Sequence, residues 1–364
     1  MNNFSTLLKP EEKAVFELRE LYSNYGYLPY KMSKFEEYDF YVKNKDFLVS
    51  DRIITFNDTN GKLLALKPDV TLSIVKNAGD EKGCTQKLFY NENVYRVSGS
   101  THAYKEIMQA GIECIGDVGT FDIAQVLTLA LKSLDKFSES FVLDVSHMGV
   151  IAAVLEEAGC DEDFNKKIMH YIGEKNCHEI KALCEEYCVD EPTAEKISSL
   201  VEIYGKGETV FPLLKKLSQS EKMKKAVSEL EEICLAVEAS PLKEKINLDF
   251  SIVNDLSYYN GVVFKGYISS IPESVLSGGQ YDRLMKKLGK KSGAIGFAIY
   301  LDLLEQLSYE RREFDVDVLL LYAEDCNKKL LFEKAEELVK EGKSVSAQKA
   351  IPQKLRYKEI VEFN

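Results

Sequence analysis

Residues 276 to 304 read LSGGQYDRLMKKLGKKSGAIGFAIYLDLL, and this stretch decides the fold. The pair Gly278-Gly279 lets the backbone pass close to a neighbouring segment or a ligand, because glycine has no Cβ. Tyr281 and Asp282 follow, and after an amphipathic turn comes the apolar run from Ala294 to Leu304. The stretch therefore predicts closely packed backbone that leads into an apolar core segment.

The composition indicates a soluble globular protein of two or three domains. The 364 residues carry a formal charge of 47 − 59 = −12. An acidic chain is a poor nucleic-acid binder, because such binding needs Lys and Arg against phosphates. The local group Lys286, Lys287, Lys290 and Lys291 is best interpreted as a solvated helix face and turn. We expect no signal peptide and no membrane span, since no apolar run approaches ~20 residues, and hence a cytoplasmic protein with reduced thiols.

The eight cysteines show no disulfide framework. Cys177, His178, Cys184 and Cys188 could in principle form a zinc site, with Cys184 and Cys188 on one helix face. However, no CxxC pair is present, and a free cysteine often packs as a small apolar side chain. Structural cysteines are therefore favoured, and no metal or cofactor is expected.

The hydrophobic patterns predict an α+β fold: an antiparallel sheet flanked by helices, with a helical insertion and a small α/β unit at the C-terminus. The Asn/Asp/Gly turn at 57–61 is a strong hairpin signal. Strands are expected at 53–56, 63–66, 86–97, 107–116, 140–145, 246–253, 258–268, 316–322 and 343–346. Helices are expected at 10–24, 67–76, 120–136, 149–158, 163–173, 178–188, 192–203, 219–237 and 326–341. The expected domains are a core of 1–145 and 241–310, a strand-free helical insertion at 146–240, and a unit at 311–364.

Five segments, in order, resemble class II aminoacyl-tRNA synthetases in their histidyl form, over roughly residues 10 to 310. The opening stretch resembles the last motif of that class, GGRYDxLxxxLG…GFAxGLERL. The other four are Tyr25–Glu36 (the first class motif, which belongs to a dimer interface), Leu66–Thr71 (LRPEGT), Val94–Gly116 (the second class motif) and Asn254–Gly261 (RGLDYYTG). The resemblance implies a class II synthetase-like core and a homodimer.

The matching residues are those that the resemblance assigns to the amino-acid end of the site. Asp69 and Thr71 would hold an α-amino group, although both also start helices well. Gln109 and Glu113 are four apart in a strand and so point to one face of the sheet. The resemblance thus implies a histidine pocket formed by Asp69, Thr71, Arg96, Gln109, Glu113, Tyr258 and Tyr259.

The residues that depart from the motifs are mainly cations that the family uses on ATP. The family's arginines fall on Gln280, Leu303 and Asn254, and Tyr300 adds bulk where the family has glycine. The loop Ser98–Lys105 has lost most of its charge. Each lost cation typically costs ~3 kcal/mol of transition-state stabilisation, so aminoacylation is not expected and no residue is assigned a catalytic role. Binding of tRNA is not expected either, because this loop has lost most of its charge and the unit after Phe314 is only about half as long as the family's anticodon-binding domain.

This pattern looks like the family of ATP phosphoribosyltransferase regulatory subunits. The resemblance implies a non-catalytic chain of histidine biosynthesis that a short catalytic chain needs for activity. It also implies histidine feedback and a homodimer within a hetero-oligomer. Two alternatives stay open: a divergent but active histidyl-tRNA synthetase, and a synthetase-like module that senses or modifies something else.

Overall fold

The computed structural model describes residues 10–44, 48, 53–79, 81–97, 103–253, 258–304, 306–307 and 313–363. The chain divides into two compact units, Met1–Leu307 and Ser308–Asn364. The helices of the expected insertion lie inside the first unit, and the three-part division of the sequence stays a prediction. No helix in the described ranges is long and apolar enough to cross a membrane.

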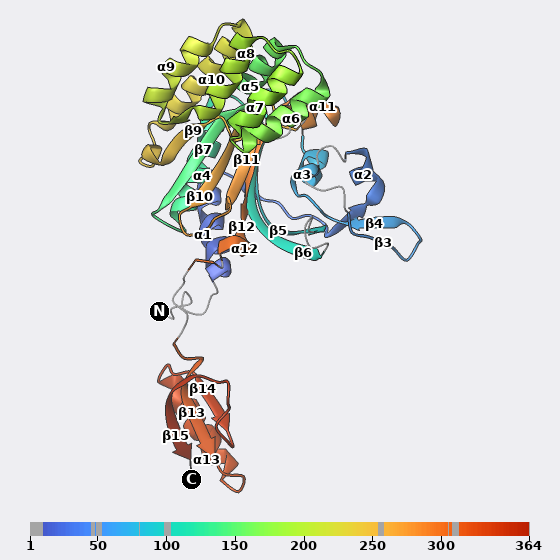
Figure 1. Cartoon of the computed structure of the whole chain (residues 1–364). Helices are drawn as coiled ribbons and strands as arrows, with labels where there is room; N and C mark the ends of the chain where they lie inside the picture. The colour runs from blue at the N-terminus through green and yellow to red at the C-terminus, as the bar shows by residue number, and fades with distance from the viewer. Residues whose placement is uncertain are drawn as a thin grey trace. The chain divides into compact units, whose positions relative to one another are not determined.

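A nine-stranded sheet forms the centre of the first unit (Figure 1). Neighbouring strands run antiparallel, except that β1 pairs parallel with β5 and β7 pairs parallel with β9. The strand order is β1 (Leu28–Pro29), β5 (Thr85–Val97), β6 (Tyr104–Gly116), β12 (Gly293–Tyr300), β11 (Leu276–Gln280), β10 (Val262–Ile268), β7 (Phe141–His147), β9 (Ile246–Asp249) and β8 (Tyr204–Gly205). The expected α+β sheet is thus present.

The two faces of this sheet differ because side chains alternate along each strand. One row of partners across six strands is apolar or glycine and lies on the helix-covered face: Ile112, Phe297, Gly278, Phe264, Val145 and Leu248. The adjacent row, on the opposite face, reads Gly111, Ala298, Ser277, Lys265, Asp144 and Asn247. Small and polar residues therefore mark the second face as the place for a site.

Helices bury the apolar face. Tyr22 of α1 packs its ring 6.2 Å from that of Phe297, and nine residues of α4 are buried. Apart from α2 and α3, which accompany a smaller sheet, the described helices of this unit are α1 (Pro10–Asn24), α4 (Thr120–Asp135), α5 (Met148–Ala158), α6 (Glu162–Gly173), α7 (Cys177–Glu186), α8 (Glu191–Glu202), α9 (Gly207–Leu217), α10 (Glu221–Val237), the 3₁₀ turn η3 (Lys243–Lys245), α11 (Asp282–Lys287) and α12 (Leu301–Leu304). Helices α4, α5 and α10 share one hydrophobic core with the sheet.

A three-stranded antiparallel sheet lies beside the ends of β5 and β6 (Figure 1). It has the order β2 (Phe35–Glu37), β4 (Leu63–Leu66) and β3 (Thr55–Asn57), and it confirms the hairpin expected around the Asn/Asp/Gly turn. Helices α2 (Tyr38–Lys43) and α3 (Thr71–Asn77) accompany it. A second apolar cluster joins these elements to Tyr281 and to Leu284 of α11. The loop from β4 into α3 carries Asp69 and Thr71 to the main sheet.

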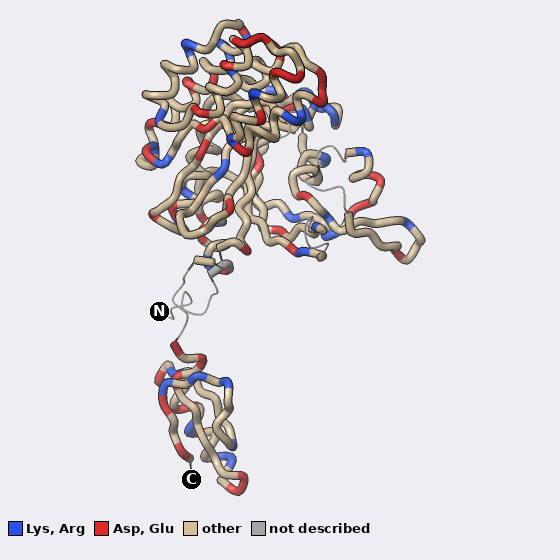
Figure 2. The backbone as a smooth tube through the Cα atoms, in the orientation of Figure 1, with Lys and Arg blue, Asp and Glu red and all other residues tan. Residues whose placement is uncertain are grey.

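The second unit contains β13 (Val316–Tyr322), α13 (Lys328–Lys340), β14 (Val345–Gln348) and β15 (Tyr357–Phe363). Its strands pair in parallel in the order β14-β13-β15. The sequence predicts a short tail after residue 346. This prediction is wrong in part, because β15 pairs along β13. In both units Lys and Arg are interspersed with Asp and Glu, as Figure 2 shows.

Four further predictions about local structure are wrong. Helix α9 was not foreseen, and Tyr204-Gly205 forms a short strand inside the stretch that was expected to hold none. Strand β9 ends at Asp249, four residues early. Cys184 and Cys188 do not share a helix face, because α7 ends at Glu186 and Cys188 has a left-handed backbone with φ 55°.

Candidate functional site

A cavity of about 530 Å³ opens on the polar face of the main sheet. It brings together all seven residues predicted for the pocket, from the loop before α3 and the first residue of α3, from β5 and β6, and from the segment before β10: Asp69, Thr71, Arg96, Gln109, Glu113, Tyr258 and Tyr259. These segments are up to 190 residues apart in sequence. The geometry therefore supports a single site; which ligand it binds stays a prediction.

Glu113 is the most constrained carboxyl group of the cavity. Thr71 Oγ1 donates to Glu113 Oε1 at 2.7 Å, and the Tyr281 hydroxyl donates to the other oxygen. The carboxyl group lies directly over Gly296, where a Cβ would overlap it. Burial raises the pKa of Glu113 to about 8, although the two hydroxyl donors act in the opposite direction. Glu113 is thus a buried acid poised to ionise when a cation arrives.

Asp69 is a second acid of the cavity and is half-buried. Its Oδ1 accepts from the backbone N–H of Leu72 at 2.8 Å, so the residue also fixes the first turn of α3. Burial raises the pKa of Asp69, and Arg96 partly counteracts this. Asp69 thus has both roles considered from the sequence, as a helix start and as a cavity residue.

Arg96 supplies a positive charge at the β5 side of the cavity. Its Nε donates to the Pro68 carbonyl oxygen at 2.9 Å, and its guanidinium also hydrogen bonds with Tyr300. These contacts fix the plane of the guanidinium group and leave further N–H donors for a ligand. Tyr300, which stands where the resemblance has glycine, lines the same cavity.

Aromatic rings form one wall. The ring centroids of Tyr258 and Tyr259 are 4.4 Å apart, and those of Tyr258 and Tyr281 are 5.9 Å apart. Gly279 of β11 is necessary for this wall, because a Cβ there would come within 2.7 Å of the Tyr259 ring, whereas a Cβ on Gly278 would meet Phe297 and Phe264. The close approach predicted for Gly278-Gly279 is confirmed.

The described positions at which the chain lacks a motif arginine do not line the cavity. Gln280, in place of an arginine, donates to Asp282 Oδ2 at 2.9 Å and does not line the cavity. Leu303 packs against the main core. Asn254, Ser257 and residues 98–102 lie outside the described residues, so their predicted effect is not tested there.

The lining residues that the sequence did not indicate include Tyr90, Lys265, Ser274 and Ser277, and Tyr281 was not assigned to the pocket. The motif contains Tyr281, but its hydrogen bond to Glu113 depends on the tertiary fold. Lys265 and Ser277 are neighbours only through the register of β10 and β11. Across the described ranges, no group of three or more His, Cys, Asp or Glu is arranged to hold a metal ion. Cys184 is buried in the core.

Comparison with known proteins identifies the family. A family model for histidyl-tRNA synthetase matches residues 7–304. An ATP phosphoribosyltransferase regulatory subunit from Clostridium botulinum (strain 657 / Type Ba4) is 30% identical over 324 residues, 86% of this chain and 76% of the relative. The chain belongs to this family of synthetase-like regulatory subunits. The regulatory subunit of Bacillus cereus (strain AH187) is 28% identical over 353 residues, 94% of this chain and 82% of that one.

Solved structures share the fold. An ATP phosphoribosyltransferase regulatory subunit/histidyl-tRNA synthetase from Bacillus halodurans has a TM-score of 0.80 at 23% identity and covers 97% of this chain and 93% of its own. The ATP phosphoribosyl transferase (HisG:HisZ) complex from Thermotoga maritima has a TM-score of 0.63 at 20% identity, over 80% of this chain and 97% of that chain. The expected class II synthetase-like fold and the regulatory, non-catalytic assignment are confirmed at the level of the family.

Proposed function

We propose that this chain activates a short catalytic ATP phosphoribosyltransferase chain and that its cavity senses histidine. The observation that carries the histidine assignment is the placement of two acids, one fixed guanidinium group and an aromatic wall around one cavity. The names of the family members support the regulatory role. Regulation would then rest on a coupling free energy between histidine binding in this cavity and the active site of the catalytic chain.

The cavity offers complementary groups for each end of histidine. The α-ammonium group would face Asp69 and Glu113, which it would help to ionise. The α-carboxylate would face Arg96, since guanidinium N–H groups match carboxylate oxygens. The imidazole would lie against the Tyr258–Tyr259 wall. A zwitterion with an aromatic side chain therefore matches the cavity at three points.

The same cavity is poorly equipped for phosphoryl chemistry. Among its described lining residues, the cations are Arg96 and Lys265. Adenylate formation needs several charges around the transferred phosphoryl group. The small number of cations supports a binding role and not the alternative of an active histidyl-tRNA synthetase.

The proposal is tested by reconstituting the complex with Asp69→Asn. The wild-type chain should raise the activity of the short catalytic chain, and histidine should inhibit the complex. Asn can still accept from Leu72 N–H, so Asp69→Asn should still activate. The inhibitory histidine concentration should rise ~10- to 100-fold, because a charged hydrogen bond is lost. Phosphoribosyl transfer is measured against histidine concentration.

Asp161→Asn is the matched control, since Asp161 starts α6 in the same way and accepts from Phe164 N–H at 2.9 Å. It should leave histidine inhibition unchanged. Absence of activation by the wild-type chain would contradict the regulatory role. Equal histidine inhibition in wild type and Asp69→Asn would contradict the pocket.

We also propose that the chain forms a homodimer through the small sheet β2-β4-β3. Phe35 and Phe56 lie on one face of this sheet, with 46% and 38% exposure and ring centroids 5.6 Å apart. Leu64 and Leu66 are half-buried on the same face. A group of exposed apolar side chains in a sheet is typical of a protein interface.

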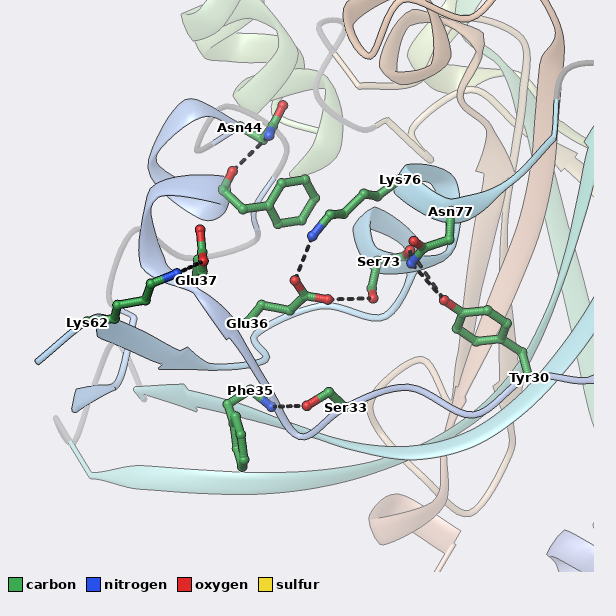
Figure 3. Close-up of polar contacts among 11 residues, drawn as sticks. Tyr30, Ser33, Phe35, Glu36, Glu37, Asn44, Lys62, Ser73, Lys76 and Asn77 are labelled. Carbon is green, nitrogen blue, oxygen red and sulfur yellow. Dashed lines mark hydrogen bonds and ion pairs between the residues drawn. The ribbon is translucent and has the colours of Figure 1, made fainter. Parts of the chain in front are cut away.

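Polar contacts hold the other face of this sheet in place. Figure 3 shows Glu36 pointing away from Phe35, toward α3. Its carboxylate accepts from Lys76 Nζ at 2.8 Å and from Ser73 Oγ at 3.4 Å. Asn77 of the same helix donates to the Tyr30 hydroxyl at 3.1 Å. Glu36 is therefore satisfied within the chain, and the Phe35–Phe56 face is the one that we assign to a second copy.

Phe56→Asp is expected to convert the dimer to a monomer, because a charge would be buried at the interface. Light scattering coupled to size exclusion measures the mass directly. Phe332→Asp, at a position 66% exposed in the second unit, is the control and should stay dimeric. A wild-type monomer, or a Phe56→Asp dimer of equal affinity, would refute this interface.

A further inference from the structure

A second cavity, of about 490 Å³, lies in the helical part of the first unit. It runs between α9 and α10, which Figure 1 shows side by side, and β9 and the turn η3 complete its lining. It shares no lining residue with the cavity of the main sheet. We call it the α9–α10 groove. Its floor is apolar and consists of Phe211, Cys234, Val237, Ile246 and Leu248.

Helix α9 follows the shape of this groove at the expense of its own regularity. A Cβ on Gly207 would come within 2.9 Å of the Phe211 ring, so the glycine leaves room for that ring in the floor. Pro212 lies inside the helix and has no N–H to donate to the Glu208 carbonyl oxygen. All four residues line the groove. Residues that break a local rule are expected where a site needs them, which marks the groove as more than a gap between helices.

Two lysines hold the walls of the groove together. Lys215 of α9 forms an ion pair with Glu231 of α10, with 2.7 Å between Nζ and Oε1. Lys206, just before α9, donates to the backbone carbonyl oxygens of Glu244 and Ile246 at 2.5 and 2.7 Å. These contacts fix α9 against both α10 and the segment before β9. The groove is therefore formed before any partner arrives.

The rest of the rim combines an exposed apolar side chain with negative charge. Leu235 of α10 is 60% exposed at the edge of the apolar floor. Among the described residues, the carboxylates of Glu208, Glu238 and Glu244 have no hydrogen-bond or ion-pair partner, whereas Lys243 carries the one rim ammonium group in that state. An apolar patch with a polar rim is typical of a protein interface. The surplus of negative charge fits a segment with Lys or Arg beside its apolar side chain.

Helix α10 also reaches the wall of the main cavity. Six residues before the exposed leucine, about 9 Å along the helix, Glu229 Oε1 lies 3.9 Å from Nε2 of His147 at the end of β7. The next residue, Met148, donates its backbone N–H to the Gly261 carbonyl oxygen at 2.8 Å. Gly261 lies two residues after Tyr259 of the aromatic wall. One series of contacts thus joins the groove helix to the proposed histidine pocket.

We propose that the α9–α10 groove is the docking site of the short catalytic ATP phosphoribosyltransferase chain, which inserts an apolar side chain flanked by Lys or Arg. The inference rests on the proposed function for the identity of the partner. Coupling between two ligands is expected through elements that contact both of their sites, and α10 is such an element. Insertion of an amphipathic segment into a groove between helices is a common mode of protein recognition.

The test measures binding of the full-length chain to the immobilised short catalytic chain by interferometry, with activation assayed on the same samples. Leu235→Glu should weaken binding at least ~10-fold, because an apolar contact is replaced by a charge on an acidic rim. Glu238→Lys should also weaken binding, and its effect should shrink at high salt. Leu213→Glu is the matched control for the leucine, since Leu213 is 51% exposed on α9 and does not line the groove. Glu232→Lys, at an exposed position of α10 outside the groove, is the control for the charge reversal.

Thermal melts and histidine titration of the isolated chain should match the wild type for all four variants, which shows that each is folded. The proposal is overturned if the wild-type chain does not bind the catalytic chain, if Leu235→Glu binds as tightly as the wild type, or if Leu213→Glu loses as much affinity as Leu235→Glu. Sedimentation velocity of the chain alone covers the other occupant: a lower mass for Leu235→Glu would make the groove an interface between copies and overturn the proposal. Binding without activation refutes only the proposed function, because the affinities of the variants still judge the groove.

Discussion

Gly296→Ala is expected to destabilise the first unit by about 3 kcal/mol and to abolish histidine binding. A Cβ at this position would overlap Glu113 Oε2 and the Ile112 carbonyl oxygen. Neither can move freely, since Thr71 and Tyr281 hold the carboxyl group and Ile112 is part of the β6–β12 ladder. The unfolding transition and a histidine titration measure the two effects.

Gly119→Ala is the matched control. A Cβ on Gly119 would meet nothing within 4 Å, and the residue has φ −116°, which any amino acid can adopt. Its unfolding temperature should stay close to that of the wild-type chain. If Gly296→Ala melts at the wild-type temperature and still binds histidine, the close contact between the Glu113 carboxyl group and Gly296 of β12 is wrong.

Much of the candidate site could be predicted from sequence because its residues belong to ordered motifs. The spacing of Gln109 and Glu113 in one strand fixes their common face without knowledge of any partner strand. Asp69 lies just before a helix and Thr71 is its first residue, so their backbone position follows from local rules. The shared cavity itself follows from the resemblance to a known fold, because strand pairing over 190 residues is not a local property.

Lys265 could not be assigned from sequence for that reason. Its strand was expected, but the floor of Ser277, Ala298 and Gly111 exists only through the register of four strands. A shift of one residue in that register would turn Lys265 to the helix-covered face. The sequence shows a lysine in a strand that is partly buried, but this does not indicate which cavity the lysine lines.

The missed elements have local causes. Helix α9 contains Pro212 in its interior, which removes a hydrogen bond and argues against a helix. Burial of Val210, Phe211 and Leu214 outweighs that cost. Strand β15 has mostly exposed side chains and no clear alternation, so its pairing along β13 gives it order that the pattern YKEIVEF does not indicate.

The stability of the first unit is expected to fall as pH rises from about 5 to about 8, and Glu113→Gln should remove much of this dependence. The pKa of Glu113 is raised by burial from 4.5 to about 8. In that window the unfolded chain ionises this carboxyl group while the folded chain retains its proton, so the folded state binds more protons. The free energy of unfolding then falls by up to ~1.4 kcal/mol for each pH unit. The raised pKa of Asp69 acts in the same direction.

Urea unfolding at several pH values measures this slope for the wild-type chain and for Glu113→Gln. Glu139→Gln is the control, because Glu139 is exposed outside the cavity, and it should keep the wild-type slope. Equal slopes in wild type and Glu113→Gln would contradict a buried, protonated Glu113.

A bound ammonium group should ionise Glu113, so at pH 7 histidine binding should release protons from the wild-type chain and fewer from Glu113→Gln. Calorimetry in buffers of different ionisation enthalpy counts those protons and connects the stability of the fold to occupation of its cavity.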